Sequence, residues 1–109
     1  MGSHRIERLN ELIKQVLGRI ILEEEDFGPG VLMTIMKVQT SDDVLHSNVF
    51  LSVYPTAKGE SVLERLTRHV FGLQQLLNKK LEMRPVPKIR FVLDRTEAEA
   101  QEIDELMEE

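Results

Sequence analysis

Basic side chains within residues 62–90 have the clearest chemical potential in this sequence. That stretch holds seven lysines and arginines against two glutamates, a local charge of +5 in a chain whose formal net charge is -5. A local basic region of this kind is the electrostatic footprint of a surface that binds nucleic-acid phosphates. The candidate contacts are Arg65, Arg68, Lys79, Lys80, Arg84, Lys88 and Arg90, with Arg5 and Arg8 as further candidates near the N-terminus.

The same charges have an ordinary alternative explanation. A charged run on a helix is often its solvated face, so clustering rather than charge alone favours phosphate contact. Arg84 precedes Pro85, and a hydrogen bond from its guanidinium to a turn carbonyl fits the sequence as well as a contact with RNA does. Phosphate contacts supply affinity and salt dependence, but they carry no base specificity.

No arrangement for catalysis or metal binding is visible in the sequence. The chain has no cysteine, which excludes disulfides, thiolate zinc ligands and a thiol nucleophile, and which fits a cytoplasmic protein. His46 and His69 lack the spacing of metal ligands, while Asp42 and Asp43 are typical of a turn. We expect no enzyme, no metal and no cofactor. No apolar run reaches the roughly 18 residues of a membrane span, so no membrane contact is expected.

The elements that position the bases follow from hydrophobic periodicity. Apolar residues at helical spacing predict an amphipathic helix from Arg5 to about Glu24. Runs rich in β-branched residues predict strands over residues 31–39 and 47–54, paired as an antiparallel hairpin. In the first strand, simple alternation places four residues on one face: Leu32, Thr34, Met36 and Val38.

A second helical region carries four of the seven central bases. Ser61 and Glu64 have the spacing of a capping box, which predicts the start of this helix. Pro85 and Pro87 end the region, because proline cannot continue a helix. Apolar residues then alternate over residues 89–93, which predicts a third strand.

A glycine interrupts this helical region in its middle. Glycine inside a helix costs about 1 kcal/mol relative to alanine, so it usually has a packing or geometric reason. We interpret Val70, Phe71 and Gly72 as a structural kink. Such a kink either tucks Phe71 inward or leaves its ring available for stacking.

The order of elements predicts a two-layer α+β fold. Two antiparallel strands, and a third that returns after a helical crossover, give a three-stranded mixed sheet with helices on one face. We predict that residues 1–4 are an expression scar, that residues 5–94 form the domain, and that residues 95–109 form an acidic helix or tail. From Asp94 onward the chain has eight acids and one base, whereas the first 93 residues carry +2.

This order is that of the type II KH fold, but the Gly-x-x-Gly loop with which KH domains usually hold RNA is absent. The chain resembles the ribosome-binding factor A family in four stretches. They are the first helix, the segment Thr40-Ser41-Asp42-Asp43-Val44 with its two strands, the helix after Gly72, and the passage from Leu81 to Asp94. The last follows the family's Leu-x-x-Arg-x-x-Pro-x-x-x-Phe-x-x-Asp pattern. The family has Ala-x-Gly at the break, and Val70 stands at the alanine position.

The resemblance implies a role in assembly of the small ribosomal subunit. It implies a cytoplasmic factor that binds 16S rRNA on the immature, free 30S subunit, promotes late rRNA processing and supports growth in the cold. A monomer is expected, with the bases named above as rRNA contacts. The acidic tail has three open roles: a solvated helix, a segment that folds back on the basic residues, or a segment that faces a basic ribosomal protein.

A different class of function also fits the sequence. An α+β module of this size can act as a protein–protein adaptor or as a dimer without binding RNA. The second face of the sheet would then supply the contact, through Val31, Met33, Ile35, Phe50 and Tyr54.

Overall fold

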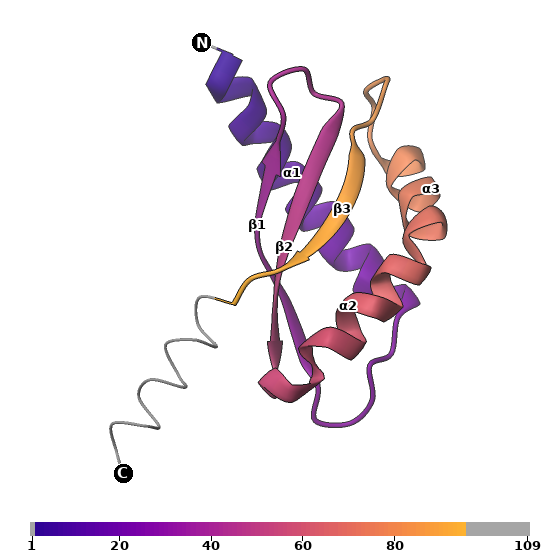
Figure 1. Cartoon of the computed structure of the whole chain (residues 1–109). Coiled ribbons are helices and arrows are strands. Elements are labelled where there is room, and N and C mark those ends of the chain that lie inside the picture. The colour runs from indigo at the N-terminus through magenta and orange to yellow at the C-terminus, as the bar shows by residue number, and fades with distance from the viewer. Residues whose placement is uncertain (1, 96–109) are drawn as a thin grey trace, which may run out of the picture.

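The fold is a three-stranded sheet with its helices on one side (Figure 1). The computed structural model describes residues 2–95. The elements in chain order are α1 (Gly2–Glu24), β1 (Leu32–Thr40), β2 (His46–Tyr54), the short 3-10 helix η1 (Thr56–Lys58), α2 (Gly59–Arg68), α3 (Val70–Lys80) and β3 (Lys88–Leu93). This confirms the predicted order, with η1 added and α1 starting at Gly2 rather than Arg5. The predicted acidic helix lies outside the described residues.

The sheet is mixed, as the sequence predicts. β1 and β2 are antiparallel, with Leu32 opposite Tyr54 at one end and Thr40 opposite Ser47 at the other. After α2 and α3 the chain returns and places β3 parallel to β2, with His46 opposite Lys88. The strand order is β1-β2-β3, so β2 is central.

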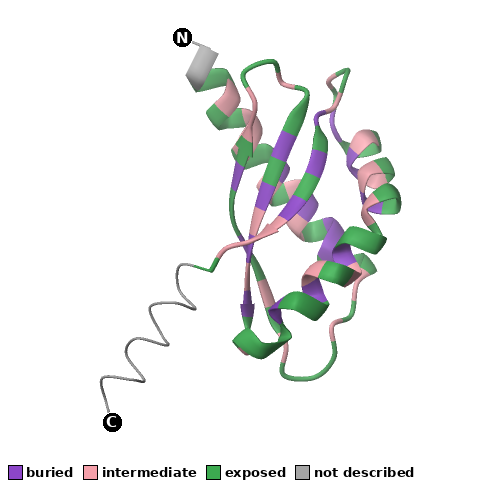
Figure 2. Cartoon of the chain, in the orientation of Figure 1, coloured by how far each residue is buried: buried purple, intermediate pink, exposed green. Residues whose placement is uncertain are grey.

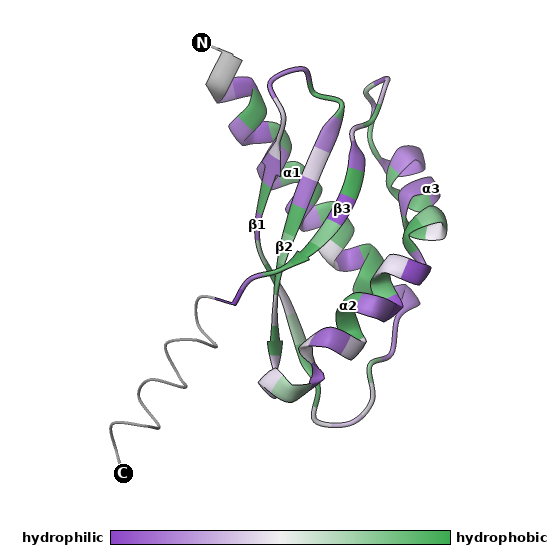
Figure 3. Cartoon of the chain, viewed as in Figure 1, coloured by the Kyte–Doolittle hydropathy of each residue, from purple (hydrophilic) through white to green (hydrophobic). Residues whose placement is uncertain are grey.

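The core lies between the sheet and the helices. In β2, and in β3 through residue 92, buried residues alternate with exposed or half-buried ones (Figure 2). Hydropathy follows this alternation only in part (Figure 3), because the buried Ser47 is polar and the half-buried Phe50 lies between Val49 and Leu51. Each fully buried aliphatic side chain contributes about 1.5–3 kcal/mol relative to exposure, so this layer dominates the stability. Its most buried members are Ile13, Leu17 and Ile21 of α1, Val49 and Leu51 of β2, Leu66 of α2 and Leu77 of α3.

A β-bulge in β1 changes which side chains face the core. Ile35 pairs with Leu51 and Lys37 pairs with Phe50, so Met36 is an extra residue with no partner. Ile35 and Val38 are therefore both buried, although simple alternation puts them on opposite faces. The predicted common face for Leu32, Thr34, Met36 and Val38 is wrong for this reason.

The second helix begins earlier than the capping box predicts. α2 starts at Gly59, and the Ser61 hydroxyl lies inside its first turn, where it donates to the Lys58 carbonyl at 2.9 Å. Ser61 is therefore not the N-cap. Gly59 is buried, and a Cβ atom there would lie 3.0 Å from a methyl carbon of Leu93. Glycine thus lets the start of α2 approach β3 closely.

The break between α2 and α3 falls at His69. This residue closes α2 and opens α3, with φ -94 and ψ 6. The predicted kink at Val70, Phe71 and Gly72 is thereby corrected, because these residues form the first turn of α3. Apart from its chain neighbours and the backbone of its own helix, nothing lies within 4 Å of a Cβ built on Gly72, so neighbouring side chains do not require glycine there. Phe71 is 75% exposed, which decides between its two predicted positions.

Candidate nucleic-acid interface

The seven central bases do not form one patch. Arg65 and Arg68 lie on α2, and Lys79 and Lys80 end α3. In β3, however, Ile89 and Phe91 face the core, so the exposed Lys88 and Arg90 lie on the opposite face of the sheet. The prediction that Lys88 and Arg90 extend the helical basic region is wrong, because a strand alternates its side chains between two faces. We call Arg65, Arg68, Lys79 and Lys80 the helix surface.

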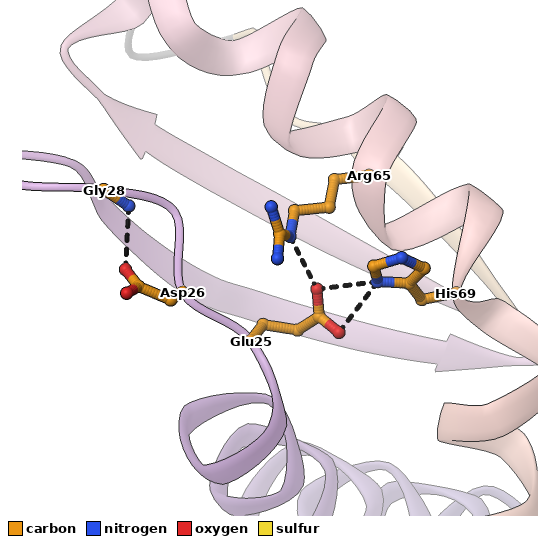
Figure 4. Close-up of polar contacts among 5 residues, drawn as sticks. All are labelled: Glu25, Asp26, Gly28, Arg65 and His69. Atoms are coloured by element: carbon orange, nitrogen blue, oxygen red, sulfur yellow. Dashed lines mark hydrogen bonds and ion pairs between the residues drawn. The ribbon is translucent and has the colours of Figure 1, made fainter.

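At its Arg65 end, the helix surface is anchored to a buried carboxylate (Figure 4). The Glu25 side chain is only 6% exposed, and it follows directly after the end of α1. Arg65 Nε donates to Glu25 Oε1 at 2.9 Å, and His69 Nδ1 lies 2.9 Å from both carboxylate oxygens. Charge-assisted hydrogen bonds of this kind are stronger than neutral ones, so Glu25 fixes both α2 and the residue at the helix break.

Sequence reasoning missed Glu25 and His69. Glu25 is one of four consecutive acids at the C-terminal end of α1, where negative charge is unfavourable for the helix dipole. That unfavourable placement was the available signal, because a carboxylate kept in such a position often has a tertiary partner. The partners themselves lie 40 and 44 residues away, and spacing along the chain does not reveal them.

A shallow pocket opens beside Arg65. It has a volume of about 230 Å³ and lies between the loop after α1 and one side of α2, from Ser61 to Arg68. Arg65 and Arg68 supply positive charge, Ser61 supplies a hydroxyl and Phe27 supplies an aromatic ring. Guanidinium groups bind phosphate oxygens with good geometry, so the lining suits a phosphate with an attached sugar or base.

The two lysines of the helix surface lie apart from this pocket. α3 has 11 residues, which places Lys79 and Lys80 about 16 Å along the helix axis from the break at His69. Lys80 also lines a groove of about 340 Å³ against α1, together with Arg19 and Glu23. The helix surface is therefore elongated, a shape that suits successive phosphates better than one compact ligand.

Arg84 has a structural role in the turn before β3. Its guanidinium donates to the carbonyls of Leu81, at 2.9 Å, and Met83, at 2.5 Å. Of the two alternatives for Arg84, the hydrogen bond to a turn carbonyl is therefore confirmed. Gln74 supports the same region, because its amide donates to the Pro87 carbonyl and accepts from the Ile89 backbone N–H.

The remaining candidates lie elsewhere. Arg5 and Arg8 are exposed near the N-terminus of α1, and Arg8 is about 25 Å along the helix axis from Glu25. They do not join the pocket. In the face proposed for an adaptor, Ile35 is buried and Val31 and Met33 pack against the core. That predicted face is wrong as a unit, and of its members only Phe50 and Tyr54 lie on the outer side.

Metal-binding clusters and membrane-spanning helices are absent from residues 2–95. No group of three or more histidine or acidic side chains is placed to hold a metal ion in this part of the chain. Among the same residues, no helix is long and apolar enough to cross a membrane.

The geometry defines a class of protein. A three-stranded mixed sheet, helices on one face and a bend in place of a Gly-x-x-Gly loop make this a KH-like α+β protein. The model of the family described as Ribosome-binding factor A matches residues 5–107. The chain belongs to the ribosome-binding factor A family, whose members are named as ribosome-binding factors and are not enzymes.

Individual relatives agree with this assignment. The chain is 31% identical to ribosome-binding factor A of Phenylobacterium zucineum, over 98% of this chain and 76% of the relative. The crystal structure of the Thermus thermophilus protein has a TM-score of 0.69 at 26% identity, covering 88% of this chain and 98% of that one. A homology model of Thermus thermophilus ribosome-binding factor A, as fitted into the cryo-EM map of its complex with the 30S subunit, has a TM-score of 0.66 at 27% identity. It covers 78% of this chain and 90% of that one.

Proposed function

We propose that this chain is an assembly factor that binds the 16S rRNA of the immature small (30S) ribosomal subunit and promotes late rRNA processing and subunit maturation. The observation that carries this proposal is its likeness to the Thermus thermophilus relative fitted into the map of a 30S complex. The presence of four bases on the helix surface supports RNA as the direct partner.

The proposed mechanism is binding without chemistry. RNA phosphates form ion pairs with Arg68, Lys79 and Lys80. The ion pair with Glu25 fixes the position of Arg65 at the pocket before RNA binds. A fixed guanidinium loses less rotational freedom on binding than a free one, which favours affinity. On this proposal the protein acts in the cytoplasm as a monomer, needs no cofactor and supports growth in the cold.

The test is sedimentation of a cell extract through a gradient, with detection of this protein across the fractions. We expect comigration with free small subunits at low salt and release as salt rises, because phosphate contacts displace counterions. The variant combines Arg68→Glu, Lys79→Glu and Lys80→Glu, all at exposed positions. We expect this variant to dissociate from the small subunits at lower salt than the unmodified protein. The slope of the logarithm of the binding constant against the logarithm of the salt concentration should fall by about 3, one for each phosphate contact that is removed.

Arg65 is kept in that variant for a structural reason. A glutamate at position 65 would face the buried Glu25 carboxylate and perturb the fold as well as the surface. Lys58→Glu serves as the matched control, because Lys58 is exposed on η1, outside the helix surface. Comigration that ignores salt, or an equal loss in both variants, would contradict the proposal.

A further inference from the structure

The outer face of the sheet is basic and carries exposed rings. We call the outward side chains of β1, β2 and β3 the open sheet face. The three strands contain no aspartate or glutamate, although the chain as a whole has 19 acids and a net charge of -5. They contain three bases, Lys37, Lys88 and Arg90, and all three are exposed. In residues 2–95 the helices lie on the other side of the sheet (Figure 1).

One base of this face contacts a ring on the central strand, and the other two lie farther along the sheet. Lys37 pairs across strands with Phe50, and its ammonium nitrogen lies 4.8 Å from the centre of that ring. Arg90 lies opposite Asn48, one outward position away from Phe50, and Lys88 lies opposite His46. Outward positions on one strand are about 6.6 Å apart, so Arg90 and Lys88 form a regular row that extends along β3 from the level of the Phe50 ring toward His46.

A second ring lies at the far end of the central strand. Tyr54 is 64% exposed and pairs with Leu32, which is 65% exposed. Tyr54 and Leu32 thus form an exposed apolar pair about 13 Å along β2 from Phe50, and exposed apolar surface of this kind gains a use when a partner covers it. A sheet surface whose strands supply aromatic rings, spaced cations and no acids matches single-stranded nucleic acid, whose bases stack on rings while its phosphates bind the cations.

We propose that the open sheet face is a second RNA-binding surface, which takes a single-stranded segment. This rests on the proposed function in taking RNA as the partner. The helix surface and the open sheet face lie on opposite sides of the sheet, so one molecule can hold two RNA segments at once. A second copy of the chain is a poorer occupant, because two faces that each carry three bases repel each other.

The test uses the full chain and a ten-residue oligouridine as the probe. The chain has one tyrosine and no tryptophan, so Tyr54 gives a single set of tyrosine ring signals in an NMR spectrum and is the intrinsic fluorophore. We expect the probe to shift the ring signals of Tyr54 and Phe50 and to quench the tyrosine emission. Backbone signals of β2 and β3 should shift together with those of α2.

Two variants separate charge from stacking. Lys88→Glu with Arg90→Glu is expected to lower the salt slope of oligouridine binding by about 1.4, which is about 0.7 for each of two single-strand phosphates no longer neutralised. Tyr54→Ala should weaken binding severalfold with no change in the slope, because it removes a ring and not a charge. Lys58→Glu is the matched control and should leave the ring shifts unchanged. All four positions are exposed, so the fold should persist.

Each other outcome would overturn the inference. Shifts confined to α2 and α3 would reject the second surface while leaving the proposed function intact. So would the absence of any shift while the protein still sediments with small subunits. If the ring signals of Tyr54 and Phe50 shift as protein concentration rises in the absence of RNA, the open sheet face binds a second copy of the chain. Equal shifts with polyglutamate would mean that the face recognises negative charge alone.

Discussion

Glu25 and its three acidic neighbours show how burial separates residues of one type. Glu23, Glu24 and Asp26 are exposed, whereas the Glu25 side chain is 6% exposed and bonded to Arg65 and His69. The Arg65 and His69 side chains keep 39% and 43% of their surface, so the same cluster is anchored inside and accessible outside. One carboxylate therefore links the stability of the bend to the placement of a candidate RNA contact.

Replacing Glu25 should destabilise the fold more than replacing its neighbour. We expect Glu25→Gln to lower the free energy of unfolding by about 1–3 kcal/mol, because it removes charge-assisted hydrogen bonds from a buried position. Glu24→Gln, at an exposed position, should change it by less than about 0.5 kcal/mol. Urea denaturation measures both, and equal values for the two variants would show that the Glu25 contacts add nothing.

Asp43 should titrate below its ordinary range. The Ser41 hydroxyl donates to its carboxylate, and so does the Leu45 backbone N–H at 3.0 Å; these bonds favour the charged form and lower the pKa of Asp43 from 3.8. Because the pKa of Asp43 is lower in the folded state, its ionised carboxylate stabilises the fold at pH values above the ordinary pKa. This stabilisation is lost as the pH falls through the pKa of the folded state. NMR titration should find a pKa below 3.8, and Ser41→Ala should raise it, since that hydroxyl is the largest cause.

At the scale of elements, the two glycines of α2 and α3 have opposite surroundings. Gly72 lies within α3 with open space where a side chain would go, whereas Gly59 packs against Leu93. Gly72→Ala should therefore raise the free energy of unfolding by about 0.5–1 kcal/mol, because alanine favours the helix and restricts the unfolded chain. Gly59→Ala should raise the free energy of unfolding by less than Gly72→Ala does, or lower it, because its Cβ would lie 3.0 Å from a methyl carbon of Leu93. Thermal unfolding of both variants decides, and a loss at Gly72 would contradict the expectation.

The elements also show which parts of the fold a sequence can reveal. β2 and β3 were predictable because apolar residues recur in them with period two, as Val49, Leu51 and Val53 do in β2 and Ile89, Phe91 and Leu93 do in β3. The break at His69 was not, because a hydrogen bond to a residue 44 positions away holds it, and the nearby glycine suggested a local cause. The start of α2 was misplaced because Ser61 and Glu64 have capping spacing but lie inside the helix.

At the scale of the whole molecule, charge is distributed by face. The net charge of -5 suggests a protein that RNA would repel, yet the three strands carry only bases and the helix surface adds four more. The sequence revealed a basic stretch, because Arg65, Lys79 and Arg90 lie close together along the chain. It did not reveal two surfaces, because that division depends on which side of the sheet each element occupies.

Met36 changes the face of the sheet on which every later residue of β1 lies. Without Met36, β1 would be a regular strand in which Met33, Ile35 and Val38 face the core and Lys37 faces outward. Because β1 contains Met36, each residue from Lys37 onward faces the side opposite to the one that strict alternation from Leu32 predicts. Because Met36 is accommodated as a bulge, the Lys37 ammonium lies over the Phe50 ring, whereas regular pairing of the same sequence would turn Lys37 toward the core.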